Sequence, residues 1–136
     1  MPETLIIYSD GGARGNPGPA AIGFVIYNED SHILKNVGMF IGTATNNQAE
    51  YRALIEALKA AIDLQAKQVF CFLDSELVVK QATGRYKVRQ PELKNLVAEV
   101  LKLSNKFLKI HFKHTPREKN KLADKLVNKA LDEAGF

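Results

Sequence analysis

The hydrophobic pattern of this chain changes its period once, near residue 46, and that change limits the folds open to it. Three segments before this point have the composition of β-strands: 5–9, 22–27 and about 33–41. The short polar link 28–32 is typical of a hairpin. After residue 46, apolar residues recur at helical spacing, which predicts an amphipathic helix with Asn46 or Asn47 as its N-cap. The chain therefore has to join an antiparallel sheet to helices.

The second half of the chain alternates between strand-like and helix-like segments. Residues 68–73 form a short, wholly apolar run that suits a strand covered on both faces. The later segments are a helix over 75–82 stopped by Gly84, a helix over 91–107, a strand over 108–114 and a helix over 119–135. Because strands separated by a helix pair in parallel, we expect strand 68–73 to lie beside strand 5–9. This order predicts an α/β fold with one five-stranded mixed sheet and helices on both faces.

The charge balance is modestly basic, with 19 Lys and Arg against 15 Asp and Glu. Much of the excess lies in segment 102–129, which carries nine basic residues and two acidic ones. Such a surface suits a polyanionic partner, although solvated helix faces have a similar composition. Cys71 is the only cysteine, and the apolar run at the N-terminus is too short for a signal peptide or a membrane span. We therefore expect a cytoplasmic protein without a membrane partner.

Four carboxylates stand at positions that need an explanation. Asp10 is expected to end the first strand and Asp74 the fourth, where each alone would pass for a turn residue or a helix cap. Glu50 projects from the apolar face of its helix, which costs several kcal/mol unless a cation or a donor meets it. Asp124 lies at the edge of the apolar stripe of the last helix, and Asn120 shares its side one turn earlier. If the two strands are parallel neighbours, Asp10 and Asp74 lie side by side.

If these carboxylates converge, they repel one another, and hard divalent cations would offset that repulsion. An all-oxygen ligand set suits Mg²⁺ or Mn²⁺, and the histidines lack the spacing with Cys71 that a zinc site needs. Gly11 and Gly12 follow Asp10 directly and would let another molecule approach the backbone there. Together with the basic surface, this pattern predicts metal-assisted phosphoryl transfer.

The chain resembles type 1 ribonuclease H over essentially its whole length. The matching stretches are "YSDGGARGNPGPAAIG", "TNNQAEYRALIEAL", "FLDSELVVKQ" and "PREKNKLADKLVNKAL", and their order and spacing fit the family as well. The resemblance implies a single ribonuclease H domain over 1–136. It also implies an endonuclease that hydrolyses the RNA strand of RNA–DNA hybrids and leaves 5′-phosphate and 3′-hydroxyl ends.

The resemblance assigns the four carboxylates to two Mg²⁺ ions, for which Mn²⁺ can substitute. By similarity, Asp10 bridges the two ions and Asp124 helps to hold the one that carries the attacking water. Glu50 and Asp74 hold the ion near the leaving 3′ oxygen. On this interpretation, the glycines after Asp10 let the RNA backbone reach the metals.

Further positions match substrate-contacting positions of the family. They are Gly11, Gly12, Asn16, Thr45, Asn46, Asn47, Gln48, Tyr86 and Asn120. Thr45 resembles a residue that binds a DNA-strand phosphate, and the amides are expected at bases or 2′-hydroxyls, the group that distinguishes RNA from DNA. Turn and cap chemistry is the alternative for the asparagines, and a core ring is the alternative for Tyr86.

The chain departs from many relatives in two places. Segment 82–95 is too short for the basic insertion that many bacterial members use to grip the hybrid. The junction before the last helix, "FKHTPREKN", lacks the flexible, histidine-bearing loop of many members. Arg117 and His114 are the possible auxiliary residues there; a guanidinium can hold a leaving phosphate but cannot act as a base.

Three alternatives share this pattern. A nuclease of the same fold could also cut double-stranded RNA or RNA–DNA junctions. A catalytically weak member could only bind nucleic acid, although four intact inward carboxylates argue against that. A detached domain of a retroelement would also have the compact form. The sequence indicates a monomer without an obligatory protein partner.

Overall fold

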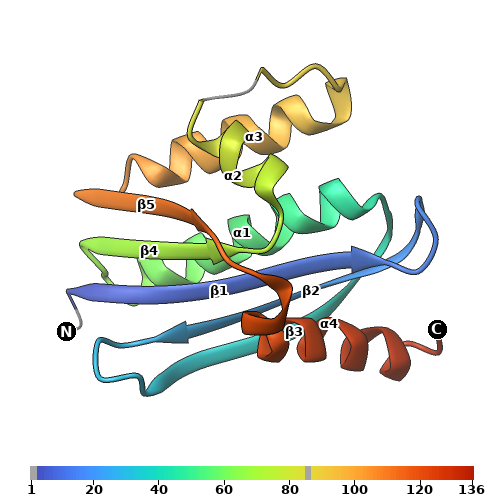
Figure 1. Cartoon of the computed structure of the whole chain (residues 1–136), viewed down its shortest axis with the longest axis horizontal. Helices are drawn as coiled ribbons and strands as arrows, with labels where there is room; N and C mark the ends of the chain where they lie inside the picture. Colours follow the sequence, from blue (N-terminus) through green and yellow to red (C-terminus); the bar gives the residue numbers. More distant parts are fainter. Residues whose placement is uncertain (1–2, 85–86) are drawn as a thin grey trace.

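A computed structural model describes residues 3–84 and 87–136 of the chain; Tyr86 lies outside them. The strands are β1 (Thr4–Ala13), β2 (Gly18–Tyr27), β3 (Ile33–Ala44), β4 (Gln68–Leu73) and β5 (Lys109–His114). They form one sheet in the order β3-β2-β1-β4-β5 (Figure 1). The β1–β2 and β2–β3 pairs are antiparallel, whereas β1–β4 and β4–β5 are parallel. The predicted five-stranded mixed sheet is confirmed.

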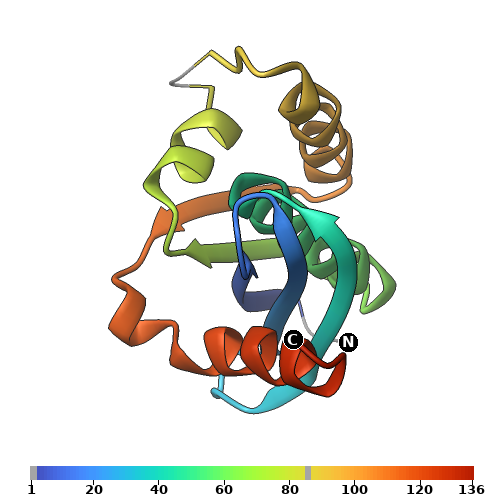
Figure 2. The ribbon, with the colours of Figure 1, turned by 90° about the vertical axis from the view of Figure 1, so that its right-hand side faces the viewer.

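Helices cover both faces of this sheet, as predicted. They are α1 (Asn46–Asp63), α2 (Glu76–Ala82), α3 (Pro91–Ser104) and α4 (Lys121–Glu133), with a short 3₁₀ helix, η1, at Arg117–Lys119. α1 packs on β1 and β2 with α3 outside it, and α4 packs on the opposite face against β2 and β3 (Figure 2). The main core lies between α1, α3 and the sheet. Among the described residues, no helix is long and apolar enough to cross a membrane.

The strands of the antiparallel half are longer than the sequence predicted. β1 continues through Asp10 to Ala13, because its pairing with β2 runs on to Ala13–Ala20. Gly11 and Gly12, which we expected to follow the end of the strand, lie inside this ladder. At the other end of the chain, η1 occupies part of the junction, so α4 begins at Lys121 instead of residue 119.

α4 lies very close to the sheet because the strands beneath it carry glycines. A Cβ atom on Gly23 would lie 2.4 Å from the carbonyl oxygen of Ala123, and one on Gly38 would lie 2.7 Å from that of Leu126. Real Cβ atoms essentially never approach a backbone oxygen so closely. These two positions therefore set the distance between α4 and the sheet, and with it the position of Asp124.

We expect Gly23→Ala to lower the free energy of unfolding by about 1 to 3 kcal/mol, because the added methyl group forces α4 away from β2. Gly12→Ala is the matched control, since the nearest atom to its Cβ would be a Val127 methyl at 3.8 Å. Its effect should stay below about 1 kcal/mol in either direction. Urea unfolding measures both variants, and equal losses would contradict the close packing.

Candidate functional site

Three carboxylates meet at one end of the sheet. One oxygen each from Asp10, Glu50 and Asp74 lies within 4.8 Å of the other two. Asp10 belongs to β1, Glu50 to the second turn of α1, and Asp74 follows β4 directly. The sequence predicted that Asp10 and Asp74 lie side by side from the parallel pairing of the first and fourth strands, and it indicated Glu50 by its place on the apolar face of a helix.

The position of Asp10 differs from the prediction in one respect: it does not end its strand. The parallel ladder between β1 and β4 stops at Ser9–Leu73, and the next residue of β1, Asp10, pairs only with Gly23 of β2. β1 thus runs past the end of β4. Asp10 lies at the point where β1 loses that neighbour, which leaves room for Asp74 beside it.

Glu50 is held by the backbone of β1. Its Oε1 accepts a hydrogen bond from the Gly11 N–H at 2.8 Å. A Cβ on Gly11 would lie 2.2 Å from the carbonyl group of Ala49, so only glycine lets α1 come this close to β1. The packing of α1 is therefore sufficient to explain the glycine at position 11, whereas no such contact constrains Gly12. We had interpreted both glycines as space for a ligand.

Burial raises the pKa of both inner carboxyl groups. The pKa of Asp10 rises to about 6, mainly through burial and further through the charges of Asp74 and Asp124, while a hydrogen bond with Glu50 works against the rise. Burial also raises the pKa of Glu50 well above its ordinary value, and Asp10 adds to this. Within the described part of the chain, Glu50 Oε2 is buried without a hydrogen-bond partner. Among the described residues, no basic side chain forms an ion pair with Asp10 or Glu50.

Asp124 lines the same pocket, of about 440 Å³, but the group within 4.8 Å comprises only the other three carboxylates. It lies in the first turn of α4, and its Oδ2 is 3.4 Å from Nδ2 of Asn128, which donates to it. The distance of α4 from the sheet places this fourth carboxylate on the wall of the pocket.

Asn120 connects the sheet, α4 and Asp74. Its side chain is 1% exposed, and its Nδ2 donates to the carbonyl oxygen of Ser9 at 2.9 Å and to Oδ2 of Asp74 at 3.1 Å. Asn120 also precedes the first residue of α4. The structure thus gives it a positioning role for Asp74, which the sequence had not indicated; a contact with substrate stays a prediction.

The N-cap of α1 is Thr45, so the predicted cap at Asn46 or Asn47 is wrong. Thr45 Oγ1 accepts from the Gln48 N–H at 3.1 Å, and Gln48 Oε1 accepts from the Thr45 N–H at 2.9 Å. This is the reciprocal capping box that a Thr followed three residues later by Gln predicts, and the sequence contained that signal.

Asn46 and Asn16 tie the β1–β2 loop to the start of α1. Asn46 Oδ1 accepts from the Ala13 N–H at 2.8 Å, and the Asn46 N–H donates to Asn16 Oδ1 at 3.0 Å. Asn46 and Asn47 line the pocket of the carboxylates. The same two residues line a neighbouring pocket of about 230 Å³ with Asn16 and Thr45. The predicted substrate positions of this region therefore form one continuous surface beside the acidic group.

The two possible auxiliary residues lie in different places. Arg117, in η1, lines the pocket of the carboxylates. His114 is the last residue of β5, as expected, and is not among the described residues that line this pocket.

Comparison with known families and proteins gives a consistent result. Residues 8–130 match a family described as reverse transcriptase-like. The chain is 44% identical over 131 residues to a bifunctional protein of Mycobacterium tuberculosis, a match that covers 96% of this chain and 36% of that protein. It is 46% identical over 127 residues to ribonuclease HI of Halobacterium salinarum, covering 93% of this chain and 64% of that one. The chain thus spans less than two thirds of the length of both relatives.

Two solved RNase H1 structures share the fold of this chain. RNase H1 of Halobacterium salinarum superposes with a TM-score of 0.93 at 44% identity, over 96% of this chain and 98% of that chain. LC11-RNase H1, solved in complex with an RNA/DNA hybrid, superposes with a TM-score of 0.91 at 47% identity, again over 96% and 98%.

Asp10→Asn should stabilise the protein in EDTA at pH 7. Because the pKa of Asp10 is about 6 in the folded state and near 3.8 when unfolded, the folded state binds more protons between these values. The wild type therefore loses stability as the pH rises from about 4 to about 6, by up to roughly 3 kcal/mol. The variant should lack this loss.

Thermal melts from pH 4 to pH 7 test this expectation, with Asp30→Asn in the exposed β2–β3 loop as the control. Asp30→Asn should follow the wild-type curve at every pH. A melting temperature of Asp10→Asn below that of the wild type at pH 7 would show that Asp10 has a structural partner instead.

Proposed function

The chain belongs to the type 1 ribonuclease H family, and we propose that it hydrolyses the RNA strand of RNA–DNA hybrids, leaving 5′-phosphate and 3′-hydroxyl ends. The observation that carries this proposal is the group of Asp10, Glu50 and Asp74, whose oxygens lie within 4.8 Å of one another in an open pocket. The similarity to LC11-RNase H1, solved with an RNA/DNA hybrid, supports the choice of substrate.

The residues present fit divalent cations. All the candidate ligand atoms are carboxylate oxygens, the donors that Mg²⁺ and Mn²⁺ prefer, and the buried Glu50 Oε2 has no partner among the described residues. Asp10, Glu50, Asp74 and Asp124 would hold Mg²⁺, with Mn²⁺ as a substitute. When bound, two such ions supply an activated water and positive charge at the scissile phosphate and the leaving oxygen.

The remaining contacts in the pocket keep these carboxylates in position before the substrate arrives. The Gly11 N–H holds one oxygen of Glu50, and the other is buried without a hydrogen-bond partner among the described residues. The Asn120 amide holds Asp74 and ties it to the backbone of β1. A site whose ligands are already oriented needs little reorganisation during the reaction. We therefore assign Asn120 as a positioning residue.

The surface formed by Asn16, Thr45, Asn46, Asn47 and Gln48 would receive the hybrid. The side-chain oxygens of Asn16, Asn46 and Gln48 accept hydrogen bonds within the protein, so their amide nitrogens are the groups that would donate to a 2′-hydroxyl or a base. Gly12 lies on the pocket wall next to them. On this proposal, the β1–β2 loop and the N-cap region of α1 recognise the RNA strand.

The single buried cysteine supports our proposal for the cellular setting. Burial raises the pKa of the Cys71 thiol, which makes it unreactive inside β4. A protein with one buried cysteine does not depend on an oxidising compartment. We propose a cytoplasmic monomer.

Cleavage of end-labelled duplexes tests the activity. The wild type should cut an RNA–DNA hybrid in Mg²⁺ but not in EDTA, and Asp10→Asn should lose at least about 100-fold in rate while still binding the hybrid. Asp30→Asn serves as the control. RNA–RNA duplexes and DNA with one embedded ribonucleotide, run in parallel, define the substrate range. Activity of Asp10→Asn within a few-fold of the wild type would refute the assignment.

Arg117 and His114 offer a second test of the site. Arg117→Ala should lower kcat by about 10- to 100-fold, because a guanidinium that lines the pocket would make a charge-assisted hydrogen bond to the phosphate. His114→Ala should leave kcat within about two-fold, since His114 lies at the end of β5. Steady-state rates at saturating hybrid compare the kcat of the two variants. The reverse order of effects would move the auxiliary role to His114.

A further inference from the structure

One part of the sheet carries aromatic side chains on the face that α4 leaves partly open. α4 packs on β2, β3 and the neighbouring part of β1. On β4 and β5, the side chains of this face remain half-buried, and Tyr8 of β1 joins them. They are Tyr8, Phe70, Phe72 and His111. The proposed function makes no use of this face, which we call the open sheet face.

The strand register arranges these rings in rows that end in basic residues. Tyr8 pairs with Phe72, and Phe72 pairs with Lys113. The Tyr8 and Phe72 rings stack with their centroids 4.9 Å apart. In the next row Phe70 stacks on His111 at 4.5 Å. The open sheet face thus combines stacked rings on β1 and β4 with a polar, basic margin on β5.

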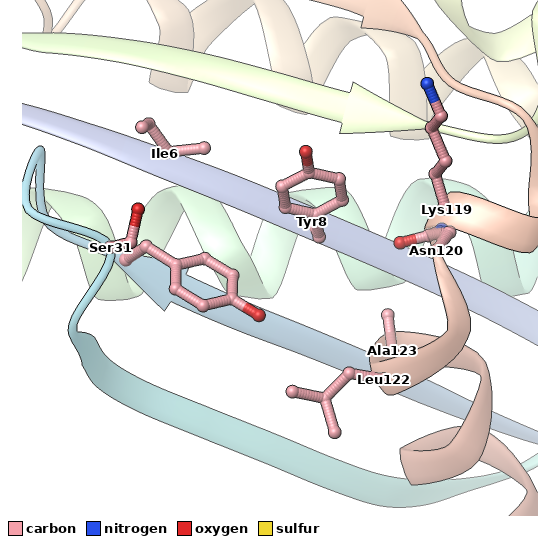
Figure 3. Close-up of a pocket in the computed structure, with 8 residues that line it drawn as sticks. Ile6, Tyr8, Ser31, Lys119, Asn120, Leu122 and Ala123 are labelled. Carbon is pink, nitrogen blue, oxygen red and sulfur yellow. The ribbon is translucent and has the colours of Figure 1, made fainter.

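A pocket of about 330 Å³ opens at the end of the first row, between the sheet and the start of α4 (Figure 3). Tyr8 and Tyr27 form one side of it, with their rings edge to face at a centroid distance of 5.9 Å. Leu122 provides an apolar wall, and Lys119 provides a cation at the rim. The pocket is large enough for one nucleobase and its sugar.

The wall of this pocket contains an unpaired polar atom. Asn120 is 1% exposed, its Oδ1 has no hydrogen-bond partner among the described residues, and this oxygen points to the side of Tyr8 (Figure 3). A buried acceptor without a donor is unusual in a folded protein. The amino group of a nucleobase would supply the missing donor.

We propose that the open sheet face binds a single strand of nucleic acid, with one base in the pocket beside Tyr8 and Tyr27. Aromatic rings on a sheet, together with basic residues at its margin, are the combination with which proteins bind single strands. Lys109 and Lys113 lie on the same face of β5 because they alternate with its other side chains, and Lys119 adds a third cation. Several cations in succession suit a chain of phosphates better than one isolated nucleotide.

This surface is separate from the pocket of the carboxylates, and Asn120, which lines the pocket beside Tyr8, connects the two through its contact with Asp74. The Nδ2 of Asn120 donates to Asp74, whereas its Oδ1 faces the pocket of the open sheet face. A hybrid with a single-stranded extension could thus be held at two places by one domain. The proposal does not rest on the nuclease activity, since the strand would bind without metal.

Fluorescence anisotropy with a fluorescein-labelled eight-nucleotide DNA strand in EDTA tests the proposal. Leu122→Glu places a negative charge in the pocket and should weaken binding by about five-fold or more, within the range that one stacked base contributes. Leu101→Glu is the matched control, because Leu101 is 49% exposed on α3 and Leu122 is 39% exposed on α4. Its affinity should match that of the wild type. Lys113→Gln, which leaves the pocket intact, should also weaken binding without changing the other properties of the protein.

Competition distinguishes this surface from the active site. A saturating amount of unlabelled hybrid should leave the labelled strand bound, and both leucine variants should cut hybrid at rates within about two-fold of the wild type. Equal affinities of Leu122→Glu and Leu101→Glu, or displacement of the strand by hybrid, would overturn the proposal. It would also be overturned if the wild type bound no strand, or bound thymidine monophosphate as tightly as the eight-nucleotide strand.

Discussion

The site end of the fold is organised around like charges that the structure holds next to each other in a partly buried place, at a cost in stability. Asp10 and Glu50 are buried, and their oxygens lie within 4.8 Å of each other and of Asp74. Both inner carboxyl groups respond with a raised pKa. The fold sustains this arrangement through two backbone features, the Gly11 N–H that holds Glu50 and the end of β4 at Leu73, which opens a space beside Asp10. A cation would turn this unfavourable cluster into a binding site.

The sequence predicted the architecture well because two signals agreed. The period change near residue 46 separated the antiparallel half from the parallel half, and the apolar run 68–73 placed a covered strand beside β1. The convergence of Asp10 and Asp74 followed from that pairing alone. Glu50 was indicated by its position on an apolar helix face, which the structure buries.

The details that the sequence did not reveal depend on contacts between distant segments. The sequence suggested that Gly11 makes room for a ligand, whereas a Cβ at this position would lie 2.2 Å from the carbonyl group of Ala49, a contact between segments far apart in the chain. In the same way, Asn120 reaches Ser9, which is 111 residues away in the chain. The capping box of Thr45 and Gln48 is different, since its local signal was present and was overlooked.

Calorimetric titration of the wild type with Mg²⁺ at pH 6, in two buffers of different ionisation enthalpy, tests the central claim most directly. Because the pKa of Asp10 is about 6 and burial also raises that of Glu50, a cation that binds to this cluster must displace protons from it. We expect saturable binding with net proton release at pH 6 that diminishes by pH 8. Binding without proton release, or no binding at either pH, would contradict the account.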